Sequence, residues 1–318
     1  MKRLRIGTRA SALALWQANY IGGALKRLNG VESELVRIRT SGDRLQSAPV
    51  AQINEQIGSE AGAKGVFIKE IEEALLAEEI DLAVHSMKDV PTETPPGLAF
   101  AAVTHREDPR DCLISRNGHT LETLPNGGRV GTSSIRRQAQ LWHRRTDLDV
   151  VDLRGNVDTR MRKLAGGEFD AIVLAIAGVN RLGLTHKVTQ ILEEDIMLPA
   201  VGQGALGIEV RQSDRETSGL VAVLDDAESR ACITAERAVL HALQGGCQIP
   251  LGALGALRGS ELHLQAAVFS AAGSDYVRCS ESGPPEQAQA IGLRLAAALI
   301  EAGADKLLRL AGRSVGQP

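Results

Sequence analysis

The sequence has few aromatic residues, few cysteines and no excess of basic charge, and each shortage argues against a class of protein. Aromatic side chains make up only 3% of the 318 residues, which leaves few platforms on which nucleic-acid bases could stack. The net charge is −3, whereas a general nucleic-acid binder usually carries a basic domain. With 43% hydrophobic and 24% charged residues, the composition is that of an ordinary globular protein of two or three domains.

The four cysteines are widely separated and form no Cys-x-x-Cys pair. We therefore expect reduced thiols, with neither a disulfide framework nor a metal site. No apolar run approaches the length of a membrane span, and the N-terminal segment Met1–Arg9 lacks the apolar core of a signal peptide. These shortages predict a cytoplasmic protein that contacts no membrane.

Short apolar segments alternate with helical periodicity over the first two thirds of the chain. This alternation predicts α/β units, each with a parallel sheet and helices on its faces. Helices are expected from Ala12 to Leu28 and from Val66 to Glu79, and residues 40–64 are expected to form a long loop. The expected strands are Leu4–Gly7, Leu35–Arg39, Leu82–Val84, Leu98–Val103, Cys112–Ser115, Arg129–Gly131, Val150–Leu153, Ala171–Ala175 and Leu206–Val210.

Two proline-containing segments, the polar 105–111 and 196–204, are expected to cross between two lobes. Two crossings between two α/β lobes predict a cleft between the lobes, which can hinge. The predicted domains are residues 1–104 with 200–223 for the first lobe, 105–199 for the second lobe, and 224–318 for a C-terminal domain.

The pattern changes in the C-terminal domain. A helix is expected from Glu228 to Leu243, and a long alanine- and leucine-rich helix from Pro285 to Leu310. Between them, glycine-containing turns separate three strands, which predicts an antiparallel meander in a smaller α+β domain. The expected strands are Ile249–Leu257, Glu261–Ser270 and Tyr276–Ser280.

Polar turns directly follow two expected strands in the middle of the chain. Thr132–Ser134 are good N-cap residues, yet Arg136 and Arg137 follow in the first helical turn, where the helix dipole disfavours cations. Arg154 ends the next strand, and Arg160 lies just beyond it. Because the planar fork of arginine suits carboxylate or phosphate, the pattern predicts an anion site; the plainer alternative is a solvated helix face.

The first lobe repeats this arrangement. Arg9 and Ser11 follow the first strand at a helix start, and Lys88 and Asp89 follow the buried strand Leu82–Val84. A Lys–Asp pair is also typical of a surface ion pair, which contributes little stability. Its place at the carboxyl edge of a predicted parallel sheet favours a ligand site instead.

Seven segments, in this order, resemble the porphobilinogen deaminase family over essentially the whole chain. Each is a weak signal alone, but their shared order is specific. The resemblance implies two lobes like those of periplasmic binding proteins and a third domain that bears a cofactor cysteine. The segments are Thr8–Ala14, Lys64–Glu70, His85–Pro91, Gly131–Gln138, Leu153–Arg160, Leu198–Gly204 and Gly245–Pro250.

The resemblance implies a transferase of porphyrin and heme biosynthesis. Such an enzyme deaminates four porphobilinogen molecules, joins them head to tail onto a covalently bound dipyrromethane, and releases linear hydroxymethylbilane. Cys247 is implied to hold the dipyrromethane through a thioether, although a lone cysteine is most often a small buried hydrophobic residue. The enzyme is expected to be a monomer whose partner is the small-molecule substrate.

The resemblance also assigns roles to individual residues. Each pyrrole ring brings an acetate and a propionate, so clustered cations fit the growing chain. The implied catalytic residues are Arg9, Lys88, Asp89 and Arg154. The implied cofactor-binding residues are Lys88, Asp89, Ser134, Arg136, Arg137, Arg160 and Cys247. The implied substrate-binding residues are Arg9, Ser11, Phe67, Arg154 and Gln203.

One segment departs from the family pattern, and two other functions stay open. The segment from Ser47 to Lys64 looks longer than the family loop and lacks a basic residue that some members carry, which leaves its role as a lid open. A two-lobed receptor for a small polyacid would need neither Cys247 nor Asp89, and such receptors are usually exported. A nucleic-acid binder would use the arginines, and its affinity would fall steeply with salt.

Overall fold

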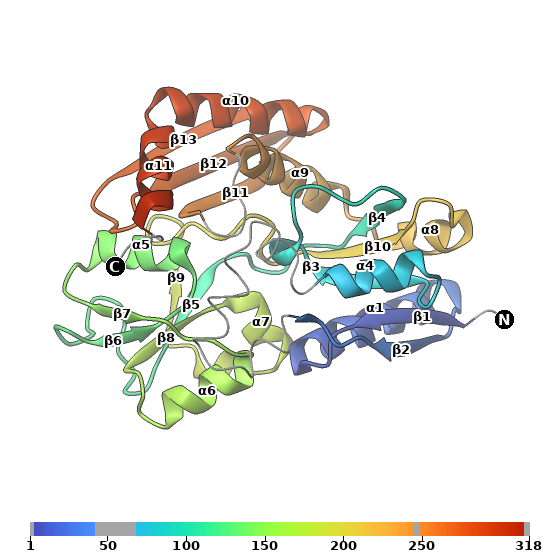
Figure 1. Cartoon of the computed structure of the whole chain (residues 1–318), viewed down its shortest axis with the longest axis horizontal. Helices are drawn as coiled ribbons and strands as arrows, with labels where there is room; N and C mark the ends of the chain where they lie inside the picture. Colours follow the sequence, from blue (N-terminus) through green and yellow to red (C-terminus); the bar gives the residue numbers. More distant parts are fainter. Residues whose placement is uncertain (1–2, 42–67, 244–248, 315–318) are drawn as a thin grey trace. The chain divides into compact units, whose positions relative to one another are not determined.

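The computed structural model describes residues 3–41, 68–243 and 249–314 (Figure 1). The chain forms two compact units, Met1–Arg106 with Ala205–Arg230 and Glu107–Gly204 with Ala231–Pro318. The division into three domains and the cleft between the lobes stay predictions. Over the described ranges, no helix is both long and apolar enough to cross a membrane.

The first unit contains one five-stranded sheet in the order β2-β1-β3-β10-β4. β1 pairs in parallel with β2 and β3, whereas β10 runs antiparallel to β3 and β4. The prediction of a parallel sheet is therefore wrong for β10. The chain returns to this unit at Ala205, whose carbonyl accepts from Met87 N just past β3, so β10 enters from the carboxyl end of β3. The strands are β1 (Leu4–Thr8), β2 (Ser33–Arg37), β3 (Leu82–Ser86), β4 (Leu98–Val103) and β10 (Leu206–Arg211).

Helices cover both faces of this sheet (Figure 1). α1 (Ala12–Asn29) and α8 (Arg215–Val221) share one core with β1, β3 and β10, and α4 (Lys69–Leu76) packs in a second core on the other face. α1 begins at Ser11, whose hydroxyl accepts from Ala14 N, as expected of an N-cap. Two short 3-10 helices, η1 (Met87–Asp89) and η3 (Ala222–Leu224), follow β3 and α8.

The second unit contains two sheets. The first has the order β7-β6-β8-β5-β9. β6 pairs in parallel with β7 and β8, but β5 runs antiparallel to β8 and β9, so the predicted parallel sheet is wrong here too. The strands are β5 (Asp111–Ser115), β6 (Arg129–Gly131), β7 (Asp149–Val151), β8 (Ala171–Ala175) and β9 (Gln190–Leu192). The helical segments are α5 (Ile135–Arg144), α6 (Val157–Ala165), α7 (Ile176–Arg181) and η2 (Thr185–Lys187), with α5 on one face and α6 and α7 on the other.

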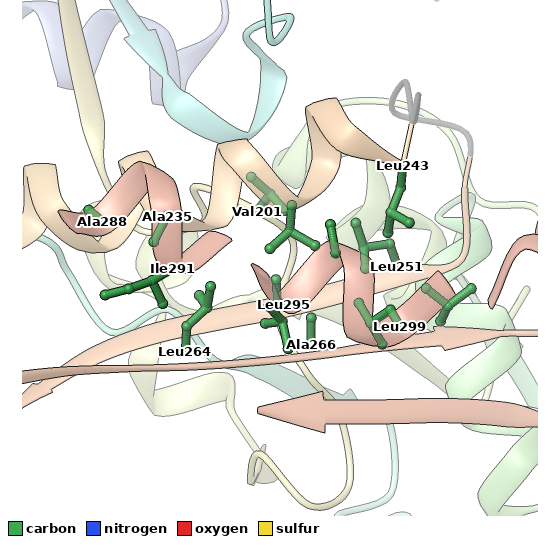
Figure 2. Close-up of a cluster of buried hydrophobic side chains, with 14 of the residues drawn as sticks. Val201, Ala235, Leu243, Leu251, Leu264, Ala266, Ala288, Ile291, Leu295 and Leu299 are labelled. Atoms are coloured by element: carbon green, nitrogen blue, oxygen red, sulfur yellow. The ribbon is translucent and has the colours of Figure 1, made fainter. Parts of the chain in front are cut away.

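The other sheet is the predicted antiparallel meander of β11 (Leu251–Arg258), β12 (Glu261–Phe269) and β13 (Tyr276–Gly283). Figure 2 shows side chains of α9 (Ala227–Ala242) and α10 (Ala288–Glu301) packed over β12, with Ile291 and Leu295 near Leu264 and Ala266. The single helix expected from Pro285 to Leu310 is wrong. It divides into η4 (Pro285–Gln287), α10 and α11 (Ala304–Ser314), because Gly303 takes a φ of 102° between the last two.

Candidate functional site

In the first unit, the carboxyl ends of β1 and β3 bring four predicted site residues to one edge of the sheet. The two strands pair in parallel, so the turns that follow them lie at the same edge. Arg9 and Ser11 follow β1, while Lys88 and Asp89 lie in η1 after β3. Asp89 is exposed and Lys88 is partly buried. The strand pairing therefore brings the four residues to one edge of the sheet, and the ligand site itself stays a prediction.

The turn that carries Lys88 and Asp89 is held from two directions. The buried Gln17 of α1 donates from Nε2 to Ser86 Oγ over 2.9 Å. Met87 is also buried, and its backbone N–H donates to Ala205 O over 3.0 Å. Because these bonds fix the residues on the N-terminal side of the turn, Asp89 is presented from an anchored backbone.

In the second unit, the carboxyl ends of β6 and β7 form a corresponding edge. The strands are parallel and in register, and Thr132 N donates to Val151 O over 3.0 Å. Ser134, at the N-cap of α5, makes no side-chain capping bond. Arg154 is about half exposed, and its Nε donates to Asp152 Oδ2 over 2.8 Å. A hydroxyl and a guanidinium thus follow neighbouring strands, as expected of an anion site.

Arg160 belongs to the same edge through the start of α6. Asn156 caps this helix by accepting from Thr159 N, and Arg160 Nε donates to Gly155 O over 2.8 Å. Gly155 has a φ of 115°, which disfavours any other residue at this position. The turn between Arg154 and Arg160 is therefore fixed by its own sequence.

Arg136 and Arg137 differ from the exposed cations, because both are buried, at 4% and 5% exposure. Asp111, the first residue of β5, lies between them. Its Oδ2 is 2.8 Å from Arg136 Nη1 and its Oδ1 is 2.7 Å from Arg137 Nη2. Burial alone would raise the pKa of Asp111, but the two guanidinium charges outweigh it and hold that pKa well below its ordinary value.

This buried cluster keeps an excess of positive charge. Two guanidiniums share one carboxylate, and Gln203 Nε2 adds a neutral donor 2.9 Å from Asp111 Oδ1. Arg136 Nε is buried and, within the described ranges, has no hydrogen-bond partner. Since a buried donor is costly to leave unsatisfied, the cluster suits a further anionic or accepting group.

A buried glutamate holds the turn that leads into Gln203. Glu236 of α9 accepts from Gly202 N and from Gly255 N, each over 2.8 Å. Gly202 has a φ of 76°, so this turn requires glycine. The carboxylate therefore ties the 200–204 segment to α9 and β11.

Asp111 and Glu236 were not predicted as functional residues from the sequence. Asp111 was placed in a polar crossing segment, although it begins the otherwise apolar strand Asp-Cys-Leu-Ile-Ser, and that position was the available signal. Glu236 lies in an amphipathic helix pattern with nothing to distinguish it. Phe67 and Cys247, both predicted site residues, lie outside the described residues, as does most of the expected loop at 40–64.

Comparisons with known proteins give one consistent result. The family model described as "Porphobilinogen deaminase, dipyromethane cofactor binding domain" matches residues 4–219, and "Porphobilinogen deaminase, C-terminal domain" matches residues 230–301. The chain is 49% identical over 315 residues to a porphobilinogen deaminase of Pelobacter propionicus, covering 99% of this chain and 96% of the relative. It is 50% identical over 308 residues to that of Trichlorobacter lovleyi, covering 96% of each. A solved structure of the methionine-binding protein MetQ is similar at 12% identity and a TM-score of 0.43, over 70% of this chain and 89% of that one.

Proposed function

The chain belongs to the porphobilinogen deaminase family, and from that premise we propose how its own residues carry out the reaction. It is a transferase that deaminates four porphobilinogen molecules, joins them head to tail onto a dipyrromethane, and releases hydroxymethylbilane. The observation that carries the residue assignment is that cations follow neighbouring parallel strands in each unit, and that the exposed carboxylate of Asp89 lies beside them in the first unit.

The residues of the second unit fit a dipyrromethane, whose two rings bear four carboxylates. When bound, this group would supply the terminal pyrrole carbon to which the first substrate is joined, and the ring added last would supply that carbon for each later substrate. Ser134 and Arg154 present a hydroxyl and a guanidinium, and Arg136 has an unsatisfied buried N–H. We assign Ser134, Arg136, Arg137 and Arg160 to binding the carboxylates of this group, and Arg154 to binding those of the substrate units from which it is built. Each hydrogen bond to a charged group contributes about 1.5–3 kcal/mol, so a few suffice to hold a ring in register.

In the first unit, we assign Arg9 and Ser11 to the carboxylates of the incoming porphobilinogen. Asp89 is exposed at the end of its anchored turn, where its carboxylate can accept the pyrrole N–H. As ammonia leaves, positive charge develops on the substrate, and the carboxylate offsets it. Asp89 can also pass a proton to the departing amine, a role typically worth about 10²–10⁴-fold in rate. Lys88 is assigned to the same step.

Three further assignments follow from the family. Cys247 anchors the dipyrromethane through a thioether, and Phe67 and Gln203 bind substrate. Gln203 Nε2 donates to Asp111 Oδ1 and to Pro109 O. Gln203 is therefore also assigned to holding Asp111, the carboxylate that pairs with Arg136 and Arg137. We further propose that the enzyme is a cytoplasmic monomer that binds no nucleic acid and no membrane.

Single-turnover kinetics on cofactor-loaded protein test the role of Asp89. Asp89→Asn keeps the size and one oxygen but removes the charge, so ammonia release should slow by about 10²-fold or more while substrate binding changes much less. Glu93→Gln, an exposed carboxylate four residues further along, is the matched control and should keep the wild-type rate. Equal rates for Asp89→Asn and wild type would remove Asp89 from the mechanism.

A further inference from the structure

A pair of buried ionisable side chains lies directly behind the turn that carries Asp89, and the proposed mechanism does not use it. His85 is the penultimate residue of β3, and Glu209 lies in the neighbouring β10. His85 Nε2 is 3.1 Å from Glu209 Oε2, and the two residues are 5% and 1% exposed. An ionised carboxylate only accepts, so an ionised Glu209 requires the tautomer of His85 that bears its proton on Nε2.

The stability of the fold does not explain why His85 and Glu209 are buried together. A buried carboxylate loses its hydration, and a well-packed apolar pair in its place is often equally or more stable. Within the described ranges, Glu209 Oε1 is buried with no hydrogen-bond partner, so the site is not even fully satisfied. A buried polar pair that is not optimised for stability points to a role in conformational specificity or function.

An aromatic ring and a second carboxyl group lie close to the His85–Glu209 pair. The Phe100 ring meets the His85 ring edge-on, with centroids 6.1 Å apart. From α4, the partly buried Glu72 adds a second carboxylate, and its pKa is raised to about 7, first by burial and then by the charge of Glu209. Glu209 therefore lies between an apolar ring and a second carboxyl group, and His85 is its described hydrogen-bonding partner.

β3 and β10, the strands that carry this pair, also hold the Met87–Asp89 turn. Gly207 of β10 is paired with His85, and Glu209 is paired with Ala83, so the two side chains meet diagonally across one ladder. A Cβ on Gly207 would collide with Met87 Sδ and come within 2.8 Å of Phe100 Cδ1. Met87, the first residue of η1, therefore packs directly on the β10 backbone next to the pair.

We infer that His85 and Glu209 are positioning residues for the Met87–Asp89 turn. Their bond fixes the end of β3 against β10, at the point where Met87 packs on Gly207 and donates to Ala205 O. This anchors the strand end from which Lys88 and Asp89 emerge. The inference rests on the proposed role of Asp89, because a fixed turn matters to catalysis only if that carboxylate acts there.

The first measurement compares His85→Leu with His85→Gln in cofactor-loaded protein. Leucine removes the donor, whereas glutamine keeps an N–H near the position of Nε2. A misplacement of about 1 Å can slow an enzyme by about 10²-fold. We expect His85→Leu to lower kcat by about 10–10²-fold with KM within about twofold, and His85→Gln to restore most of the rate. Equal loss in both variants, or a loss confined to KM, would overturn the inference.

Arg211→Met is the matched control for general damage to this unit. Arg211 lies two residues from Glu209 on the same side of β10, and its guanidinium donates to Leu75 O and Ile80 O and pairs with Asp214. Its loss should lower the melting temperature at least as much as His85→Leu but leave kcat unchanged. If kcat falls equally in both, His85 acts through stability and the inference fails.

A double variant separates this inference from the proposed function. If His85 acts through Asp89, adding His85→Leu to Asp89→Asn should slow ammonia release by less than about twofold. If the second change slows Asp89→Asn as much as it slows the wild type, His85 acts independently and only the inference fails. If Asp89→Asn alone matches the wild type, the proposed role of Asp89 fails, and the inference falls with it.

Discussion

Asp111 Oδ2 lies 2.8 Å from Arg136 Nη1, and both side chains are buried. This pair explains why a cation begins α5, where the helix dipole disfavours positive charge. Arg136 Nη1 is paired with this carboxylate inside the protein and donates to Leu198 O, while Arg136 Nε has no hydrogen-bond partner within the described ranges. Arg137 shares the same carboxylate. Two arginines of the predicted anion site, Arg136 and Arg137, are thus held in place by a carboxylate of the protein itself.

Asp111→Asn should destabilise the protein by about 3–5 kcal/mol, because removing one partner of a buried ion pair leaves uncompensated charge. Urea unfolding at pH 7 measures the loss. The control is Asp149→Asn, whose exposed carboxylate lies 3.6 Å from Arg129 Nε in the same sheet and should contribute less than about 1 kcal/mol. Similar small losses in both variants would mean that the buried cluster is not a structural element.

Gly207→Ala should destabilise the protein by about 1–3 kcal/mol, because the new methyl group has no room beside Met87 and Phe100. Gly219→Ala is the opposite case, since nothing lies within 4 Å of its Cβ position in α8. That change should stabilise by about 0.4–1 kcal/mol. Thermal melts of both variants check the contrast, and a stable Gly207→Ala protein would contradict the packing of Met87 on β10.

Glu72→Gln should change how stability depends on pH. The pKa of Glu72 is about 7 in the folded protein, raised by burial and then by Glu209, against an ordinary value of 4.5. The folded state therefore keeps a proton that the unfolded chain has lost, so this group lowers stability as pH rises from about 4.5 to 7.

The gain from Glu72→Gln should accordingly be larger at pH 8 than at pH 5, by on the order of 1 kcal/mol, since partial exposure screens the effect. Urea unfolding at the two pH values gives the difference. Glu73→Gln alters an exposed neighbour on α4 and should show no such dependence. A gain for Glu72→Gln that does not vary with pH would refute the burial of this carboxyl group.

Arg154→Leu should leave the fold intact, within about 0.5 kcal/mol, because its pair with Asp152 is about half exposed. It should nevertheless lower the fraction of protein that carries dipyrromethane, since a carboxylate-binding cation is lost. Arg116→Leu, which removes a similarly exposed arginine paired with Asp170, is the control and should load normally. Normal loading of Arg154→Leu would place the anion site elsewhere.

The sequence predicted helix starts, strands and hairpins well where these depend on neighbouring residues in the chain. The start of the helix after Ser11, the strand Arg129–Gly131 and the meander of β11 to β13 all follow from residues within a few positions. The direction of β10 did not follow, because it depends on where the chain re-enters the first unit, at Ala205. The break between α10 and α11 could have been predicted from Gly303, but the continuous helical periodicity on both sides favoured a single helix.

The candidate site could be predicted only in part, for the same physical reason. Arg154, Lys88 and Asp89 could be predicted as site residues because each follows an expected strand, and their roles stay predictions. Asp111 and Glu209 were not found, because each acts through a partner that is distant in the sequence, Arg136 in one case and His85 in the other. A single carboxylate in an apolar strand is a weak signal until the fold supplies its partner.

The intact mass of the purified protein tests the central claim most directly. Protein made in cells that synthesise porphobilinogen should exceed its sequence mass by one dipyrromethane, Cys247→Ser should match its own sequence mass, and Cys279→Ser, altered at a partly buried cysteine, should still carry the group. An unmodified wild-type mass, or a dipyrromethane that persists in Cys247→Ser, would contradict the account.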